Sequence, residues 1–65
     1  MKTINSTTIL KVSGRKNISN DITFFHNDIK YSVIYEGKYL DMHFYLQALN
    51  ENGEWKKIAK IIINH

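Results

Sequence analysis

The chain has 65 residues and a formal charge of +3, from nine basic and six acidic side chains, and it contains neither cysteine nor proline. This length allows one small domain, residues 1–65, which buries only about 60% of its unfolded surface and therefore needs tight packing or a partner. Disulfide bridges and thiolate zinc sites are excluded, and because no stretch is suited to a secretory signal or a membrane span, we expect a cytoplasmic protein without membrane contact.

The N-terminal third of the chain gives weak structural signals. Residues 1–6 are polar and are expected to be frayed. The β-branched run at 7–12 predicts a first strand, and the loop at 13–17 follows it, where Gly14 can adopt a positive φ. An irregular connection at 18–21 leads to the middle of the chain.

The middle of the chain contains three apolar runs separated by two short turn sequences. The runs are 22–26, 29–35 and 39–49, and the turns are Asn27-Asp28 and Glu36-Gly37. The first turn predicts a type I′ hairpin, because Asn and Asp tolerate the left-handed region. It pairs Phe24 with Tyr31, whereas the second turn pairs Val33 with Leu40, and both registers put the same side chains on one face.

This register divides the side chains of the three strands between two faces. The core face is expected to hold Ile22, Phe24, Ile29, Tyr31, Val33, Leu40, Met42, Phe44, Leu46 and Ala48. The opposite face is expected to hold Phe25, Lys30, Ser32, Ile34, Tyr39, Asp41, His43, Tyr45 and Gln47. Aromatic and aliphatic side chains on this second face distinguish it from an ordinary solvated face.

The C-terminal segment 54–64 follows the clearest turn signal of the chain, at 50–53, and it has two interpretations. As a strand, it places Trp55 and Ala59 on the core side, together with Ile61 and Ile63. As a helix, it gathers Trp55, Ile58, Ala59 and Ile62 on one face. The preceding turn and the three consecutive isoleucines at 61–63 favour the strand.

These elements predict an all-β fold: a small antiparallel meander of four to five strands, curled into an SH3-like or OB-like barrel or packed as a dimer. The alternative is an α+β fold, with a four-stranded antiparallel sheet and a C-terminal helix across it. Neither fold would by itself determine the function.

The second face also has two interpretations. A curled sheet or the N-terminal strand would cover it, or it forms a binding surface, because exposed apolar patches on small proteins mark partner sites. In the second case the surface consists of Phe25, Lys30, Ile34, Tyr39, His43 and Tyr45. Aromatic anchors of this kind suit contact with another protein.

No residue pattern indicates catalysis, a metal site or a cofactor. Ser32, Asp41 and His43 share a face, but the expected pairs are Ser32 with Asp41 and Lys30 with His43, which does not place the histidine between the other two. Three glycines without phosphate-loop spacing exclude the common nucleotide-binding signatures. We therefore expect a protein that is not an enzyme.

The sequence favours a non-enzymatic binding or inhibitor protein. Abundant lysine, isoleucine and asparagine indicate an AT-rich genome, and with the small size this suits a phage or mobile-element protein that blocks a host machine such as a defence nuclease or polymerase. One alternative is a small-barrel protein that binds single-stranded nucleic acid, in which Arg15, Lys16 and Lys60 would contact phosphates. Another is a structural subunit of a homodimer.

Overall fold

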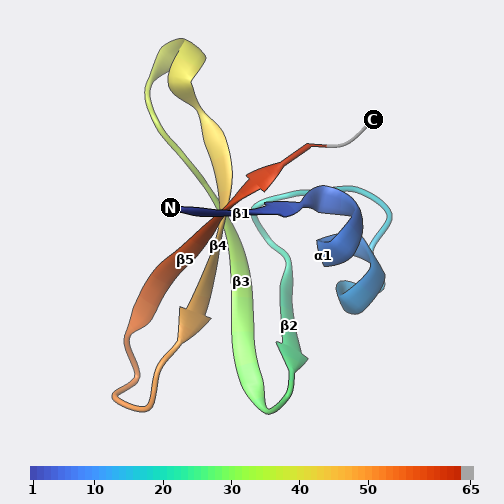
Figure 1. Cartoon of the computed structure of the whole chain (residues 1–65), viewed down its shortest axis with the longest axis vertical. Coiled ribbons are helices and arrows are strands. Elements are labelled where there is room, and N and C mark those ends of the chain that lie inside the picture. The colour runs from blue at the N-terminus through green and yellow to red at the C-terminus, as the bar shows by residue number, and fades with distance from the viewer. Residues whose placement is uncertain (64–65) are drawn as a thin grey trace.

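The computed structural model describes residues 1–63, so the last residue of the segment 54–64 lies outside the described part. The chain is mostly β, as predicted, with one short α-helix (Figure 1). The elements are β1 (Lys2–Asn5), α1 (Ser6–Ser13), β2 (Thr23–His26), β3 (Ile29–Glu36), the 3₁₀ turn η1 (Tyr39–Asp41), β4 (His43–Leu49) and β5 (Trp55–Ile62).

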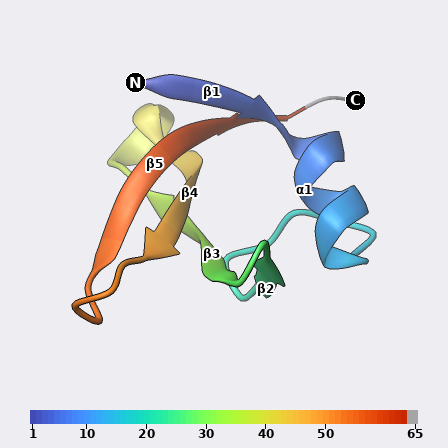
Figure 2. The same ribbon diagram turned by 60° about the horizontal axis from the view of Figure 1, so that its bottom comes forward.

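The five strands form one open sheet in the order β1-β5-β4-β3-β2. Strand β1 runs parallel to β5, with Lys2 beside Ala59 and Ile4 beside Ile61, whereas all other neighbours are antiparallel. The sheet is therefore mixed and not a purely antiparallel meander. Figure 2 shows that it curls and that α1 lies at its open side.

The N-terminal segment differs most from the sequence-based expectation. Residues 2–5, expected to be frayed, form β1 at an edge of the sheet, and the strand predicted at 7–12 is wrong because this segment is helical. Ser6 and Ile9 are the buried residues of α1, one turn apart. Tertiary packing of this face outweighs the β propensity of its threonines and isoleucine.

The hairpin between β2 and β3 is confirmed in both turn and register. Asn27 and Asp28 have φ values of 52° and 66°, as a type I′ turn requires. Phe24 pairs with Tyr31, and their rings stack with centroids 5.3 Å apart.

The register predicted between the third and fourth runs is wrong, although the faces are preserved. Val33 pairs with Leu46 and not with Leu40, a shift of six residues (46 − 40 = 6). Glu36-Gly37 is not a two-residue turn, because the chain continues through η1 before it returns. An even shift keeps each strand residue on its predicted face, but Leu40 and Met42 leave the sheet and are exposed.

Segment 54–64 forms β5 through Ile62, which confirms the strand and excludes the alternative C-terminal helix. A β-bulge interrupts its pairing with β4: Leu46 lies opposite Ala59, whereas the next residue, Gln47, lies opposite Lys57. Because β5 has one extra residue at the bulge, the side chains of residues 55–57 lie on the faces opposite to those that simple alternation predicts. Trp55 consequently pairs with Leu49 on the second face and not on the core side as predicted.

The hydrophobic core lies between α1 and one face of the sheet. Its buried members are Ile9, Ile22, Val33, Leu46, Ala59 and Ile61. Of the predicted core face, Val33 and Leu46 are fully packed, whereas Ile29 next to the type I′ turn is 42% exposed. The helix α1 lies on the core side, against β1 and β2. The opposite side of the sheet, called the outer face below, is not covered by any helix or strand within residues 1–63.

Candidate binding surfaces

The outer face is built by the side chains that alternate with the core residues. In the central rows, Ser32 pairs with Gln47, and Ile34 pairs with Tyr45, which in turn pairs with Lys60. These side chains are half-buried because they cover one another across three strands. The predicted residues Ile34, Tyr45 and Lys60 are thus neighbours.

Tyr45 is the centre of a polar network on this face. The ammonium of Lys57 lies 4.4 Å from its ring centroid and also forms an ion pair with the carboxylate of Glu36. His43 meets the same ring edge-on, with centroids 6.5 Å apart. The exposed face of Tyr45 is therefore occupied by side chains of the protein itself.

Phe25 and Lys30 form a separate pair near the other edge of the sheet. Phe25 is 70% exposed, and the ammonium of Lys30 lies 5.9 Å from its ring centroid. The strand registers place Phe25 two strands from Tyr45 and four residues along, a separation of about 16 Å. The outer face thus carries two distinct aromatic–lysine pairs and not one continuous aromatic surface.

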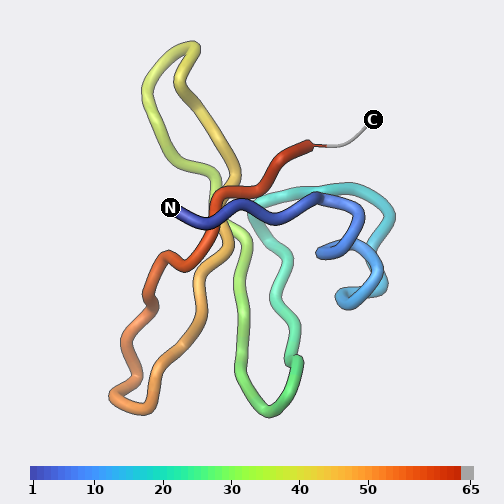
Figure 3. The backbone as a smooth tube through the Cα atoms, in the orientation of Figure 1, coloured from blue at the N-terminus to red at the C-terminus, as the bar shows by residue number. Residues whose placement is uncertain are grey.

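Tyr39 does not lie on the outer face, where the sequence places it. It belongs to the connection between β3 and β4, residues 37–42, which we call the tip and which projects from the body of the molecule (Figure 3). Tyr39 is 93% exposed and Leu40 is 100% exposed. Two large adjacent side chains are therefore presented to solvent with almost no contact to the rest of the chain.

The backbone of the tip is sharply constrained. The amide of Asp41 donates a hydrogen bond to the carbonyl of Lys38 at 2.9 Å. Gly37 has φ 133°, and a Cβ atom there would collide with the carbonyl oxygen of Asp41 and lie 2.8 Å from the Cα of Met42. Tyr39 itself has φ 53°, a left-handed conformation that is costly for an aromatic residue.

Arg15 and Lys16, assigned to phosphate contact, lie in the exposed loop after α1. Because α1 packs on the core side of the sheet, these two side chains are not part of the outer face that carries Lys60. The structure does not gather the three basic residues at one site.

The polar residues considered for catalysis are also separated. Ser32 pairs with Gln47 and His43 pairs with Glu36, so the expected Ser32–Asp41 and Lys30–His43 pairs do not form. Across residues 1–63, no three histidine, aspartate or glutamate side chains are close enough to hold a metal ion. In the same range the sole α-helix has eight residues, whereas crossing a bilayer takes about 20.

Sequence reasoning missed Leu40 as a surface residue and assigned it to the core face. The signal that could have identified it is the sequence Glu36-Gly37-Lys38, which brings two charges and a glycine between the apolar runs. Such a stretch is also typical of a longer loop.

No protein-family model, no curated protein and no solved structure matches this chain.

Proposed function

We propose that this chain is a non-enzymatic protein-binding module that docks through its tip. The observation that carries the proposal is the exposure of Tyr39 and Leu40, adjacent large side chains at 93% and 100%. Burying a leucine-sized apolar side chain contributes about 1.5–3 kcal/mol, and tyrosine is among the residues that dominate protein interfaces. A partner with an apolar socket would gain both contributions.

The constrained backbone of the tip supports the same proposal. Gly37 fits closely against Asp41 and Met42, and the 38–41 turn is closed by a backbone hydrogen bond. A preordered loop loses less conformational entropy on binding than a flexible one. The left-handed conformation of Tyr39 is the kind of local strain that clusters at ligand-binding sites.

The single-stranded nucleic-acid alternative receives less support from this geometry. Stacking of successive bases needs aromatic rings at neighbouring positions. Phe25, Tyr39 and Tyr45 lie at three separate places, and lysine ammoniums already lie against the rings of Phe25 and Tyr45. The homodimer alternative would use the outer face and leave the tip free.

As a narrower proposal, the module blocks a larger protein machine, in the manner of a phage-encoded or mobile-element inhibitor. The projecting tip supports this, because a loop that extends beyond the body of a small module can enter a cleft in a larger surface. The lysine-, isoleucine- and asparagine-rich composition, which is typical of an AT-rich genome, supports the phage or mobile-element origin.

Site-specific photo-crosslinking tests the docking surface. A photoreactive phenylalanine analogue replaces Tyr39 in one variant and Phe25, on the outer face, in a matched control, and each variant is irradiated in lysate of the native cells. We expect a discrete crosslinked protein from position 39 that unmodified wild-type chain suppresses by competition. A discrete product from position 25 alone would overturn the assignment to the tip.

The purified partner then allows a quantitative comparison. The double variant Tyr39→Ser/Leu40→Ser is expected to weaken binding by at least about 30-fold, the equivalent of two lost anchors of about 1 kcal/mol each. Phe25→Ser is expected to change it less than about threefold. Equal losses in the two variants, or binding of single-stranded DNA that falls steeply with salt and requires Tyr45, would refute the proposal.

A further inference from the structure

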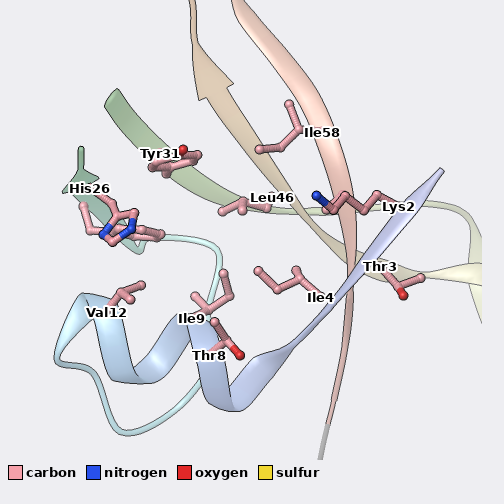
Figure 4. Close-up of a pocket in the computed structure, with 12 residues that line it drawn as sticks. Lys2, Thr3, Ile4, Thr8, Ile9, Val12, His26, Tyr31, Leu46 and Ile58 are labelled. Carbon is pink, nitrogen blue, oxygen red and sulfur yellow. The ribbon is translucent and has the colours of Figure 1, made fainter. Parts of the chain in front are cut away.

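The concave side of the sheet contains a cavity of about 370 Å³ next to α1 (Figure 4). All five strands and the helix contribute to its lining, which is mainly apolar and includes Ile4, Ile9, Val12, Phe24, Leu46 and Ala59. Volumes of this order are typical of small-molecule sites.

Two features of β5 keep this interior open. The buried residue that faces Leu46 is Ala59, whose side chain is a single methyl group. The bulge beside it leaves Ile58 at the cavity wall with 41% of its surface exposed. A core at ordinary density would place larger side chains here.

The cavity has one strongly polar side. Lys2 and Ile4 share the inner face of β1, and Figure 4 shows Lys2 extended toward Leu46, across the cavity from His26. Within residues 1–63 the ion pair is the one between Lys57 and Glu36, so Lys2 has no carboxylate partner in this part of the chain. None of the residues that line the cavity is acidic. Lys2 is exposed at the mouth of the cavity, and an ammonium beside an apolar wall favours an anionic group that carries an apolar body.

We infer that this cavity binds a small amphipathic anion, with its apolar body among Ile4, Ile9 and Leu46 and its single carboxylate or sulfonate beside Lys2. The same apolar walls without a charge at the mouth would favour a neutral ligand, so the charge preference is the distinguishing property. The site is independent of the tip, and a tip variant such as Leu40→Ser should bind the same ligand.

The test compares two fluorescent probes with the same aromatic rings. One is 1-anilinonaphthalene-8-sulfonate, and the other is N-phenyl-1-naphthylamine, which lacks the sulfonate. We expect the intact chain to bind the sulfonate probe at a single saturable site and at least about threefold more tightly than the neutral probe. Decanoate and 1-naphthoate, as competitors, distinguish an aliphatic from an aromatic body.

Substitutions separate the contribution of charge from that of shape. Lys2→Gln should lower the affinity for the sulfonate probe about threefold to tenfold and should change the affinity for the neutral probe by less than about twofold. Lys11→Gln, on α1 outside the cavity, should change neither affinity. Val12→Phe narrows the cavity and should weaken both probes. Ala59→Leu is the second filling variant, and the urea midpoint of each variant shows whether it remains folded.

Methyl NMR spectra locate the bound probe. The methyl signals of Ile4, Ile9 and Leu46 should shift on addition of the sulfonate probe, whereas those of Ile34 on the outer face should not. Equal affinity for the two probes, insensitivity to Lys2→Gln, several non-saturating sites or shifts centred on Ile34 would each overturn the inference.

Discussion

The ammonium of Lys57 lies 4.4 Å from the ring centroid of Tyr45, although the two residues are not directly paired in the sheet. The β-bulge explains this contact, because it turns Lys57 from the core side, where simple alternation would place it, to the outer face. Glu36 approaches the same ammonium from the far side of β4 and completes a bridge over the ring.

Replacing Lys57 by methionine should lower the free energy of unfolding by about 1 kcal/mol. A cation–π contact at an exposed site contributes about 0.5–1 kcal/mol, and an exposed ion pair adds about 0.2–1 kcal/mol. Urea denaturation at low salt measures the change, and the difference from wild type should shrink at high salt because the ion pair is screened. Lys56→Met is the matched control, and an equal loss there would contradict the bridge.

Truncation of two leucines of the same hairpin should change the stability by very different amounts. Leu46→Ala removes a core side chain that is 4% exposed and should cost about 2–5 kcal/mol. A chain of this length has a total stability of roughly 3–10 kcal/mol, so this variant loses a large fraction of its stability and should unfold at a clearly lower temperature than the wild type. Leu40→Ala, at a fully exposed position, should change stability by less than about 0.5 kcal/mol.

Thermal unfolding followed by circular dichroism distinguishes the two leucine variants. If Leu40→Ala were as destabilising as Leu46→Ala, the tip would have to pack against the body of the protein. The placement of Leu40 at the surface would then be wrong.

The sequence predicts those elements whose signals are local. Asn27-Asp28 specifies its hairpin because few dipeptides adopt two successive left-handed conformations, and the turn at 50–53 similarly indicates β5. Alternation then assigns Val33 and Leu46 to the core although their pairing is shifted. The shift is an even number of residues, and such a shift leaves each side chain on the same face of the sheet.

The rest of the fold depends on contacts between distant parts of the chain. The helix α1 forms in a threonine-rich segment because Ile9 reaches the core, and its C-terminal signal, Gly14 with φ 72° bonded to the carbonyl of Leu10, is a single residue in the sequence. The bulge near Ile58 has no local signal. Its effect on Trp55 and Lys57 could therefore not be predicted.

Gly37→Ala should be the most damaging of the glycine-to-alanine substitutions. The added Cβ would meet the backbone of Asp41 and Met42, whereas at Gly53, φ 78°, nothing lies within 4 Å. Gly53→Ala should cost about 1–2 kcal/mol from its left-handed backbone alone. Gly37→Ala should exceed this in urea denaturation and should shift the amide signals of residues 38–42, and equal costs at the two positions would contradict the close fit of the tip.

Tyr39→Asn should stabilise the protein while it weakens partner binding. Tyr39 has φ 53° and is 93% exposed, so its ring contributes little to the fold while its backbone occupies a region that asparagine tolerates better. The expected gain is about 0.5–1 kcal/mol, which corresponds to a rise in Tm of roughly 2–8 °C for a domain of this size. Such a trade of stability for activity is common at binding sites.

Calorimetry measures the Tm of the variant Tyr39→Asn and of the control variant Leu40→Asn. Leu40 is equally exposed but is not among the residues with positive φ, so Leu40→Asn should leave Tm within about 2 °C of wild type. A fall in Tm for Tyr39→Asn would mean that the tyrosine ring holds the tip together in the free protein. In that case the ring would stabilise the left-handed backbone, and the strain at Tyr39 would no longer support a binding role for the tip.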